Sequence, residues 1–395
     1  MFSTTVHTIF ARISSRLHRI LQSREGFCVI NEPKTVDFFL CTNAPNHFFS
    51  LCAPFDDPKP GYRRFLIKGS AGGGKSTAMK RIAARFSKME SLTERIHCSS
   101  DPESLDGVIL HDARCSIMDA TPPHAVEPVF PASFQTVCDF WSCLRESVLT
   151  PRLKELVQLQ SEISASHEKC RRLLSCADLL LSDNRRLIAA HTDFKKIDAL
   201  SARMAAREFP KTGRKGILHH RLLSAMTMHG ILTYTDTPYI LCERICIIED
   251  PFGVSADRLL KNLIEYALKA GYEVFACPSP IAPDCMTEQV MIPSLSLAFL
   301  TRTRYTQWEG CKPYRTIRYT RFTGRTVLQE KKHALSFQRK AAEAILSAAQ
   351  THLCEAKRLH DQLEALYHDG VDFNLVERRT AALAEAVARR YPVVL

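Results

Sequence analysis

Long apolar runs are absent from this sequence of 395 residues, although 45% of its residues are hydrophobic. A transmembrane helix needs about 20 mostly apolar residues in a row, so the sequence predicts no membrane span. Closely paired cysteines are also missing. None of the 15 Cys residues forms a CxxC pair, and the nearest two, Cys242 and Cys246, are separated by three residues. Without zinc-knuckle spacing, or a small secreted chain that needs disulfides, these thiols indicate a reduced, cytoplasmic protein.

Acidic residues are scarce in two segments of the chain, whose net charge is +11. Residues 1–24 contain four Arg residues and no acid, and their apolar residues recur at helical spacing. This pattern predicts a basic amphipathic segment over residues 1–36, which fits a targeting peptide, a membrane-surface helix or a helix docked on the protein itself. Residues 302–340 contain eleven Lys or Arg against two acids, a net charge of +9. This excess favours a phosphate-bearing partner, although a solvated surface has the same composition.

The sequence RRFLIKGSAGGGKSTAMKRI begins at residue 63 and matches GxxxxGK[ST] between a short apolar strand and a helix. Glycines let the backbone wrap around a phosphate at the positive end of a helix. In this pattern Lys75 reaches the β- and γ-phosphates, and the Ser76 hydroxyl binds Mg²⁺. The predicted nucleotide-binding residues are Gly69, Ser70, Ala71, Gly72, Gly73, Gly74, Lys75, Ser76 and Thr77.

A second Mg²⁺ ligand is expected at the end of a neighbouring strand. Cys115 to Asp119 reads as such a strand, and Asp119 either holds the metal or caps the turn before Pro122. No Glu follows Asp119 to activate water. The loop after it offers Glu127 and His124 as substitutes, and without a good base we expect slow hydrolysis or a catalytic group from elsewhere.

A Ser- and Asp-rich turn separates these two motifs. It follows a predicted strand, and loops at the carboxyl ends of parallel strands line ligand crevices. Its residues can therefore contact the γ-phosphate or a substrate, or they can simply cap a helix. These candidates are His97, Ser99, Ser100 and Asp101.

The second half of the chain repeats the first at an offset of about 181 residues. IIEDPFGVSADRLLKNL, beginning at residue 247, falls on the glycine-rich segment, with Gly253 on Gly72. The phosphate-handling residues are replaced: Lys75 by Ala256, Ser76 by Asp257 and Asp119 by Thr301. We expect Ser255 to cap the following helix and Asp257 to satisfy its dipole, so the second copy is predicted not to bind nucleotide.

Both copies continue into long segments that are apolar at every third or fourth position and almost free of Gly and Pro. Each segment predicts an antiparallel helical hairpin, either a lid or plain packing helices. The predicted fold is α/β, with two tandem P-loop NTPase-like domains over residues 37–210 and 211–395. Each domain is expected to have a parallel sheet flanked by helices and one hairpin insertion.

The chain resembles a family of bacterial tandem P-loop ATPases from about residue 37 onward. The resemblance rests on KGSAGGGKST, IHCSSDPESLDGVIL, IMDATPPHAVEP and LHDQLEALYHDGVDF. It implies ATP binding through Gly69 to Thr77, with Asp119 at the Walker B position. Members of that family usually have a better-formed second P-loop, and this sequence departs from them there.

The sequence therefore predicts a Mg²⁺-dependent ATPase, a hydrolase with Lys75 and Asp119 as catalytic residues and one working site per chain. A nucleotide or small-molecule kinase remains an alternative. A nucleotide-gated protein that binds nucleic acid is another, because Arg315, Arg318 and Arg321 alternate with aromatic residues. The same arginines suit an arginine finger that acts on the ATP of the first half.

Overall fold

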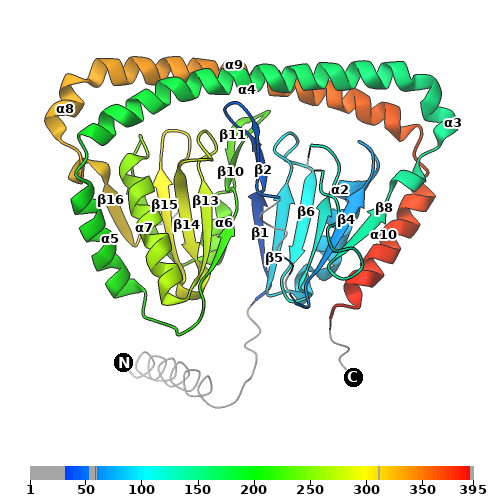
Figure 1. Cartoon of the computed structure of the whole chain (residues 1–395), viewed down its shortest axis with the longest axis horizontal. Helices are drawn as coiled ribbons and strands as arrows, with labels where there is room; N and C mark the ends of the chain where they lie inside the picture. Colours follow the sequence, from blue (N-terminus) through cyan, green and yellow to red (C-terminus); the bar gives the residue numbers. More distant parts are fainter. Residues whose placement is uncertain (1–31, 53–57, 59, 124, 310–311, 392–395) are drawn as a thin grey trace, which may run out of the picture.

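The computed structural model describes residues 32–52, 58, 60–123, 125–309 and 312–391, and it contains two six-stranded sheets covered by two long helices (Figure 1). Of the predicted amphipathic segment, only residues 32–36 are described, and Lys34 already belongs to the first strand. Among the described residues, no helix is both long enough and apolar enough to cross a membrane.

The first sheet has the strand order β1-β5-β6-β7-β4-β8. Its strands are β1 (Lys34–Phe39), β4 (Arg63–Lys68), β5 (Leu92–His97), β6 (Leu105–Leu110), β7 (Cys115–Asp119) and β8 (Gln135–Asp139). All its neighbours are parallel except β6, which is antiparallel to both β5 and β7. The seven residues between β5 and β6 explain this, because a parallel crossover needs a dozen or more. The expectation of an all-parallel sheet is therefore wrong.

The second sheet repeats this arrangement strand for strand, in the order β9-β13-β14-β15-β12-β16. Its strands are β9 (Ile217–His220), β12 (Arg244–Glu249), β13 (Glu273–Pro278), β14 (Thr287–Ile292), β15 (Leu297–Arg302) and β16 (Arg315–Arg318). Here β14 is the antiparallel strand. The equivalence predicted for Asp119 and Thr301 is confirmed by the register. Asp119 lies opposite Ile67, and Thr301 lies opposite Ile248.

The two sheets pack face to face through a shared core. Phe38, Leu66 and Ile96 of the first sheet cluster with Ile247 and Phe275 of the second. One charged contact joins the halves inside this core: Arg221 donates two hydrogen bonds to Glu94, at 2.5 and 3.1 Å. Burial alone would raise the pKa of Glu94, but Arg221 and His111 lower it below its ordinary value.

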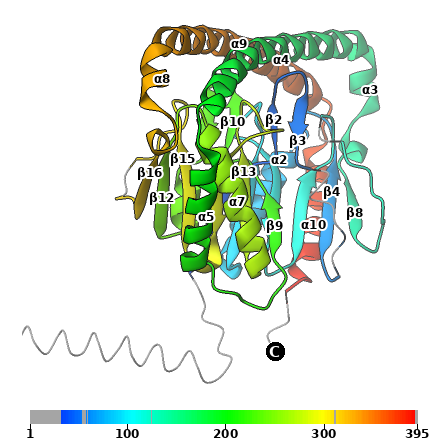
Figure 2. The same ribbon diagram turned by 60° about the vertical axis from the view of Figure 1, so that its left-hand side comes forward.

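Helices from both halves of the sequence cover each outer face. The first sheet carries α2 (Lys75–Phe86) and α10 (Phe373–Ala388), and the second carries α7 (Val254–Ala270) and α5 (Phe194–Glu208). Figure 2 shows α5 and α7 side by side. The exchange is anchored by two equivalent backbone hydrogen bonds, from Asp193 N to Phe322 O at 2.9 Å and from Asp372 N to Cys143 O at 2.8 Å. The ranges 37–210 and 211–395 thus each contribute a helix to the other's core.

The long segments form single helices, so the predicted hairpins are wrong. α4 (Leu153–Ala190) has 38 residues and α9 (Lys332–His368) has 37, and the two lie antiparallel across the molecule (Figure 1). Neither contains a Gly or Pro to break it. The apolar stripe that suggested a partner within each segment instead meets the other long helix. Leu174 and Ala177 of α4 pack with Leu346 and Leu353 of α9.

Shorter elements complete the fold. Two antiparallel hairpins, β2–β3 and β10–β11, extend beside the long helices, and α6 packs against β1. These elements are β2 (Cys41–Asn43), β3 (Phe48–Ser50), β10 (Ser224–Thr227), β11 (Gly230–Thr233), α3 (Glu146–Leu149), α6 (Asp236–Leu241) and α8 (Arg325–Glu330). Among the described residues, the observed class is therefore α/β, with two mixed, mostly parallel sheets flanked by helices.

Candidate functional site

The glycine-rich loop joins the end of β4 to the start of α2. Gly72 and Gly74 have positive φ values of 64° and 80°, and Gly74 is the N-cap of the helix. Only glycine adopts such a backbone without strain, which is why the loop can turn its N–H groups toward one point. Thr77 lies exposed in the first turn of α2. The predicted residues therefore form one continuous concave turn at a helix N-terminus.

Polar side chains converge on this turn. Lys75 Nζ lies 2.7 Å from Ser70 O and 3.5 Å from Asp119 Oδ2. Both ionic side chains are largely buried, with 11% and 14% exposed. Asp119 also accepts hydrogen bonds from the N–H and hydroxyl of Thr121, so it does cap the turn after β7 as well as facing Lys75. Ser76 Oγ accepts a hydrogen bond of 2.9 Å from Leu105 N.

The donors of the loop are free of competing side chains. Within the described part of the chain, no side chain accepts a hydrogen bond from the backbone of residues 69–77. The start of α2 also has no acidic residue in its first turn. The loop therefore presents backbone donors, one lysine and a helix dipole, with no internal anion to neutralise them.

The second loop is filled by its own carboxylate. Asp250, directly after β12, is completely buried. It accepts backbone hydrogen bonds from Phe252 (3.1 Å), Gly253 (3.0 Å), Ser255 (2.7 Å) and Ala256 (3.0 Å). Burial raises the pKa of Asp250, and the four N–H donors oppose that rise. Asp250 thus stands where an anion would sit, at the N-terminus of α7.

Two further contacts support the predicted alignment of the loops. Gly253 has a positive φ of 76°, like Gly72. Thr287 N donates to Asp257 Oδ1 at 2.8 Å, as Leu105 N does to Ser76. At this offset, the donors to Asp250 correspond to the N–H groups of residues 71, 72, 74 and 75.

The predicted cap of the second helix is wrong. Gly253 is the N-cap, and the Ser255 hydroxyl is buried with no hydrogen-bond partner among the described residues. Asp257 bonds to Thr287 and Lys261. Asp250 satisfies the helix N-terminus instead, because it precedes a tight turn that folds back over it. The sequence signal was present: an Asp stands where the first copy has Gly69.

The other predicted candidates lie in separate contacts. Glu127 pairs with Lys68 Nζ at 2.5 Å, and His124 is outside the described residues. His97 bonds to Asp37 and to the carbonyl of Pro102, at 2.7 Å each. Ser99 is buried and Ser100 is partly buried, both in the turn after β5. Asp101 lies 3.5 Å from Lys357 Nζ on α9, a residue that sequence reasoning missed.

The end of α9 lies on the glycine-rich loop. A Cβ atom added to Gly72 would lie 2.8 Å from the carbonyl oxygen of Glu364. Ala71 packs against a small apolar cluster that includes Leu359 and Leu363. Nothing in the local sequence links residues 359–364 to a loop almost 300 residues earlier, so no pattern could have found this contact.

Two sets of residues have the chemistry of a metal site. Ser76 and Asp119 offer hydroxyl and carboxylate oxygens beside the loop, which suit Mg²⁺. His360, Asp361 and Glu364 place one ligand atom each within 4.8 Å of one another on α9. The second set is half exposed, and Asp361 is already paired with Lys357.

A histidine is partly buried in the helical pair near this end of α9. Burial lowers the pKa of His167 to about 4, and Arg171 and His360 act in the same direction. The unfolded chain binds a proton at about pH 6.5, where folded His167 stays neutral. The free energy of unfolding should therefore fall as the pH drops from about 6.5 to 4. Melting temperatures of the protein and of His167→Gln measured across this range should converge as the pH falls. The exposed His191→Gln serves as the control, and two parallel pH profiles for the protein and His167→Gln would contradict this assignment.

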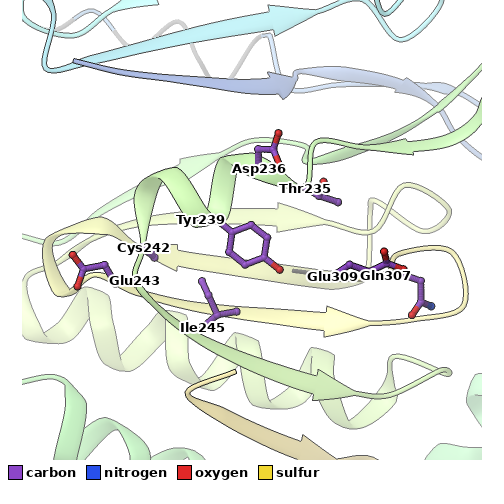
Figure 3. Close-up of a pocket in the computed structure, with 8 residues that line it drawn as sticks. All are labelled: Thr235, Asp236, Tyr239, Cys242, Glu243, Ile245, Gln307 and Glu309. Carbon is purple, nitrogen blue, oxygen red and sulfur yellow. The ribbon is translucent and has the colours of Figure 1, made fainter. Parts of the chain in front are cut away.

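A surface pocket of about 710 Å³ lies between α6, β12 and the loop after β15 (Figure 3). Its rim is acidic, with Asp236, Glu243 and Glu309, and Tyr239 lies between them. None of the predicted nucleotide-binding residues lines it. Acidic walls do not suit a triphosphate, so this pocket is separate from the glycine-rich loop.

Comparison of the chain with protein-family models, with curated protein sequences and with solved structures found no match. The functional argument therefore rests on the residues around the glycine-rich loop.

Proposed function

We propose that this chain binds one ATP with Mg²⁺ in the glycine-rich loop of its first half and hydrolyses it slowly. The observation that carries the proposal is the contrast between two equivalent loops. In the second loop, four backbone donors hold the carboxylate of Asp250. In the first, Gly69 stands at that position, and Lys75 and Asp119 line the turn. The first loop is built to take an anion from outside, and the second already contains one.

Each residue then has a role that follows from its position. The backbone of residues 71–75 holds the β-phosphate, and Lys75 leaves Ser70 O to contact the β- and γ-phosphates. Ser76 and Asp119 hold Mg²⁺, which neutralises the charge of the phosphates. ATP is favoured over GTP because the sequence has no NKxD-type guanine-binding motif.

Slow turnover follows from the lack of a placed base. Glu127, the described candidate nearest in sequence to Asp119, is paired with Lys68. Asp119 is followed by Ala120 and Thr121, neither of which accepts a proton readily. Phosphoryl transfer to an acceptor is the second candidate reaction, and analysis of products with and without candidate acceptors separates it from hydrolysis.

Calorimetric titration with ATP and Mg²⁺ tests the proposal directly. One molecule of ATP should bind per chain, because only one loop is free of an internal carboxylate. Two equivalent sites would contradict it, as would binding that survives disruption of the glycine-rich loop.

Replacing Asp119 by Asn should preserve the fold and remove Mg²⁺-dependent turnover. The amide keeps the shape of the side chain and can still accept from Thr121, but the metal loses a negative ligand. Turnover should drop by about 100-fold, corresponding to about 3 kcal/mol in the barrier. Asp139→Asn, at the end of the neighbouring strand β8, is the matched control. Unchanged turnover in Asp119→Asn would reduce Asp119 to a turn cap.

The basic stretch of residues 302–340 supports the nucleic-acid alternative only weakly. Arg302 and Arg318 both pair with Glu249, and Arg304 pairs with Glu343. β16, which carries Arg315 and Arg318, forms the edge of the second sheet remote from α2 (Figure 1). An arginine finger from this strand to the glycine-rich loop of the same chain is therefore excluded by the fold.

A further inference from the structure

The exchanged helix α9 brings residues of the second half to the candidate nucleotide site. Its residue Glu364 touches Gly72 through the backbone. Lys357 is seven residues earlier, which places it about 10 Å back along the helix on the same face. There it meets the turn after β5, with its Nζ 3.5 Å from Asp101 Oδ2. α9 thus spans from the glycine-rich loop to the turn after β5.

Ser76 lies between these two points of contact. Its hydroxyl accepts a hydrogen bond from Leu105, the first residue after the turn that contains Asp101. The polar face of α9 therefore covers the region next to the proposed Mg²⁺ ligands. The Lys357 side chain is 19% exposed, and on this face it is accompanied by Asp361 and Glu364. A triphosphate beneath this face would meet two carboxylates and one ammonium group.

We propose that Lys357 contacts the terminal phosphate of the bound nucleotide and so distinguishes ATP from ADP. This inference rests on the proposed function. The lysine has three donors on a flexible stem, so it can keep Asp101 and also bind a phosphate oxygen. A terminal phosphate would then link α9 to the turn after β5. The charge expected of an arginine finger comes from this helix rather than from residues 302–340.

The second half carries the opposite arrangement. The buried positions of the two long helices match at an offset of 179 residues: Leu174 and Ala177 of α4 correspond to Leu353 and Ala356 of α9. At this offset Lys357 corresponds to Asp178, which pairs with Arg185 at 2.6 Å. A lysine thus occurs above the loop with free donors, and an acid occurs above the loop that its own carboxylate fills.

The test compares the affinities of Lys357→Met for ATP and ADP, each with Mg²⁺, measured by calorimetry. ATP affinity should fall by about 10- to 100-fold, the range expected for one charge-assisted hydrogen bond, while ADP affinity should change by less than about threefold. Lys357→Arg should recover part of the ATP affinity because it keeps the charge. The matched control is Arg358→Met, which removes a cation on the next residue that pairs with Glu355 and is 56% exposed.

Asp101→Asn separates a phosphate contact from a structural ion pair. If Lys357 serves only to hold Asp101, then Lys357→Met and Asp101→Asn should weaken ATP and ADP equally. That result, or an unchanged ATP affinity in Lys357→Met, overturns the inference while leaving the ATP site in place. Absence of ATP binding by the unaltered protein is a different outcome, and it overturns the proposed function itself.

Discussion

Replacing Lys75 by alanine should weaken ATP binding by about 100-fold while leaving the fold intact, a loss of about 3 kcal/mol. The lysine bonds only to Ser70 O and lies near Asp119. Its removal takes away the one cation at the turn and leaves the Asp119 carboxylate facing the phosphates. Attraction is lost and repulsion is uncovered in the same step. Turnover should disappear with the binding.

The measurement is the dissociation constant of a fluorescent ATP analogue, with thermal melts to check the fold. Lys80→Ala is the matched control, because Lys80 lies on the same helix and is exposed to solvent. It should bind like the unaltered protein. If Lys75→Ala keeps full affinity, the glycine-rich loop is not where the nucleotide binds.

The glycine-rich loop could be predicted from the sequence because its parts are contiguous. A strand, a turn and a helix within 24 residues place Gly72, Gly74 and Lys75 by local geometry alone, and the structure has that order. The repeat was detectable for a similar reason, since the same sequence of elements recurs at a nearly constant offset. The antiparallel strand β6 was missed because periodicity gives the existence of a strand and not its direction.

The helix exchange could not be predicted in this way. An apolar stripe specifies that a helix has a partner, but not which one. Leu359 and Leu363 would satisfy the same pattern within a hairpin, against α4, or above the loop at Ala71, where they lie. Which alternative wins depends on the links between helices. Only three residues separate α4 from α5, so α5 must begin where α4 ends, beside the second sheet.

Replacing Asp250 by alanine should have the largest effect on stability, a loss of about 3–5 kcal/mol in the free energy of unfolding. The carboxylate receives four backbone hydrogen bonds in a site with no exposure to solvent. Alanine leaves those donors buried without an acceptor and removes the negative charge at the start of α7. Denaturant unfolding, followed by the far-ultraviolet signal, gives the free energies to compare.

Two further variants decide why the loss occurs. Asp250→Asn keeps the volume and one acceptor oxygen but not the charge, so its cost should fall between those of the alanine variant and the unaltered protein. Asp257→Ala removes the acid that sequence reasoning assigned to this helix, and its cost should stay near 1 kcal/mol because only Thr287 N and an exposed ion pair with Lys261 are lost. If Asp257→Ala costs as much as Asp250→Ala, the carboxylate at Asp250 is not what holds the second loop. If the order is as expected, the second half keeps the shape of an anion-binding loop because it carries its own anion, and it needs no nucleotide to stay folded.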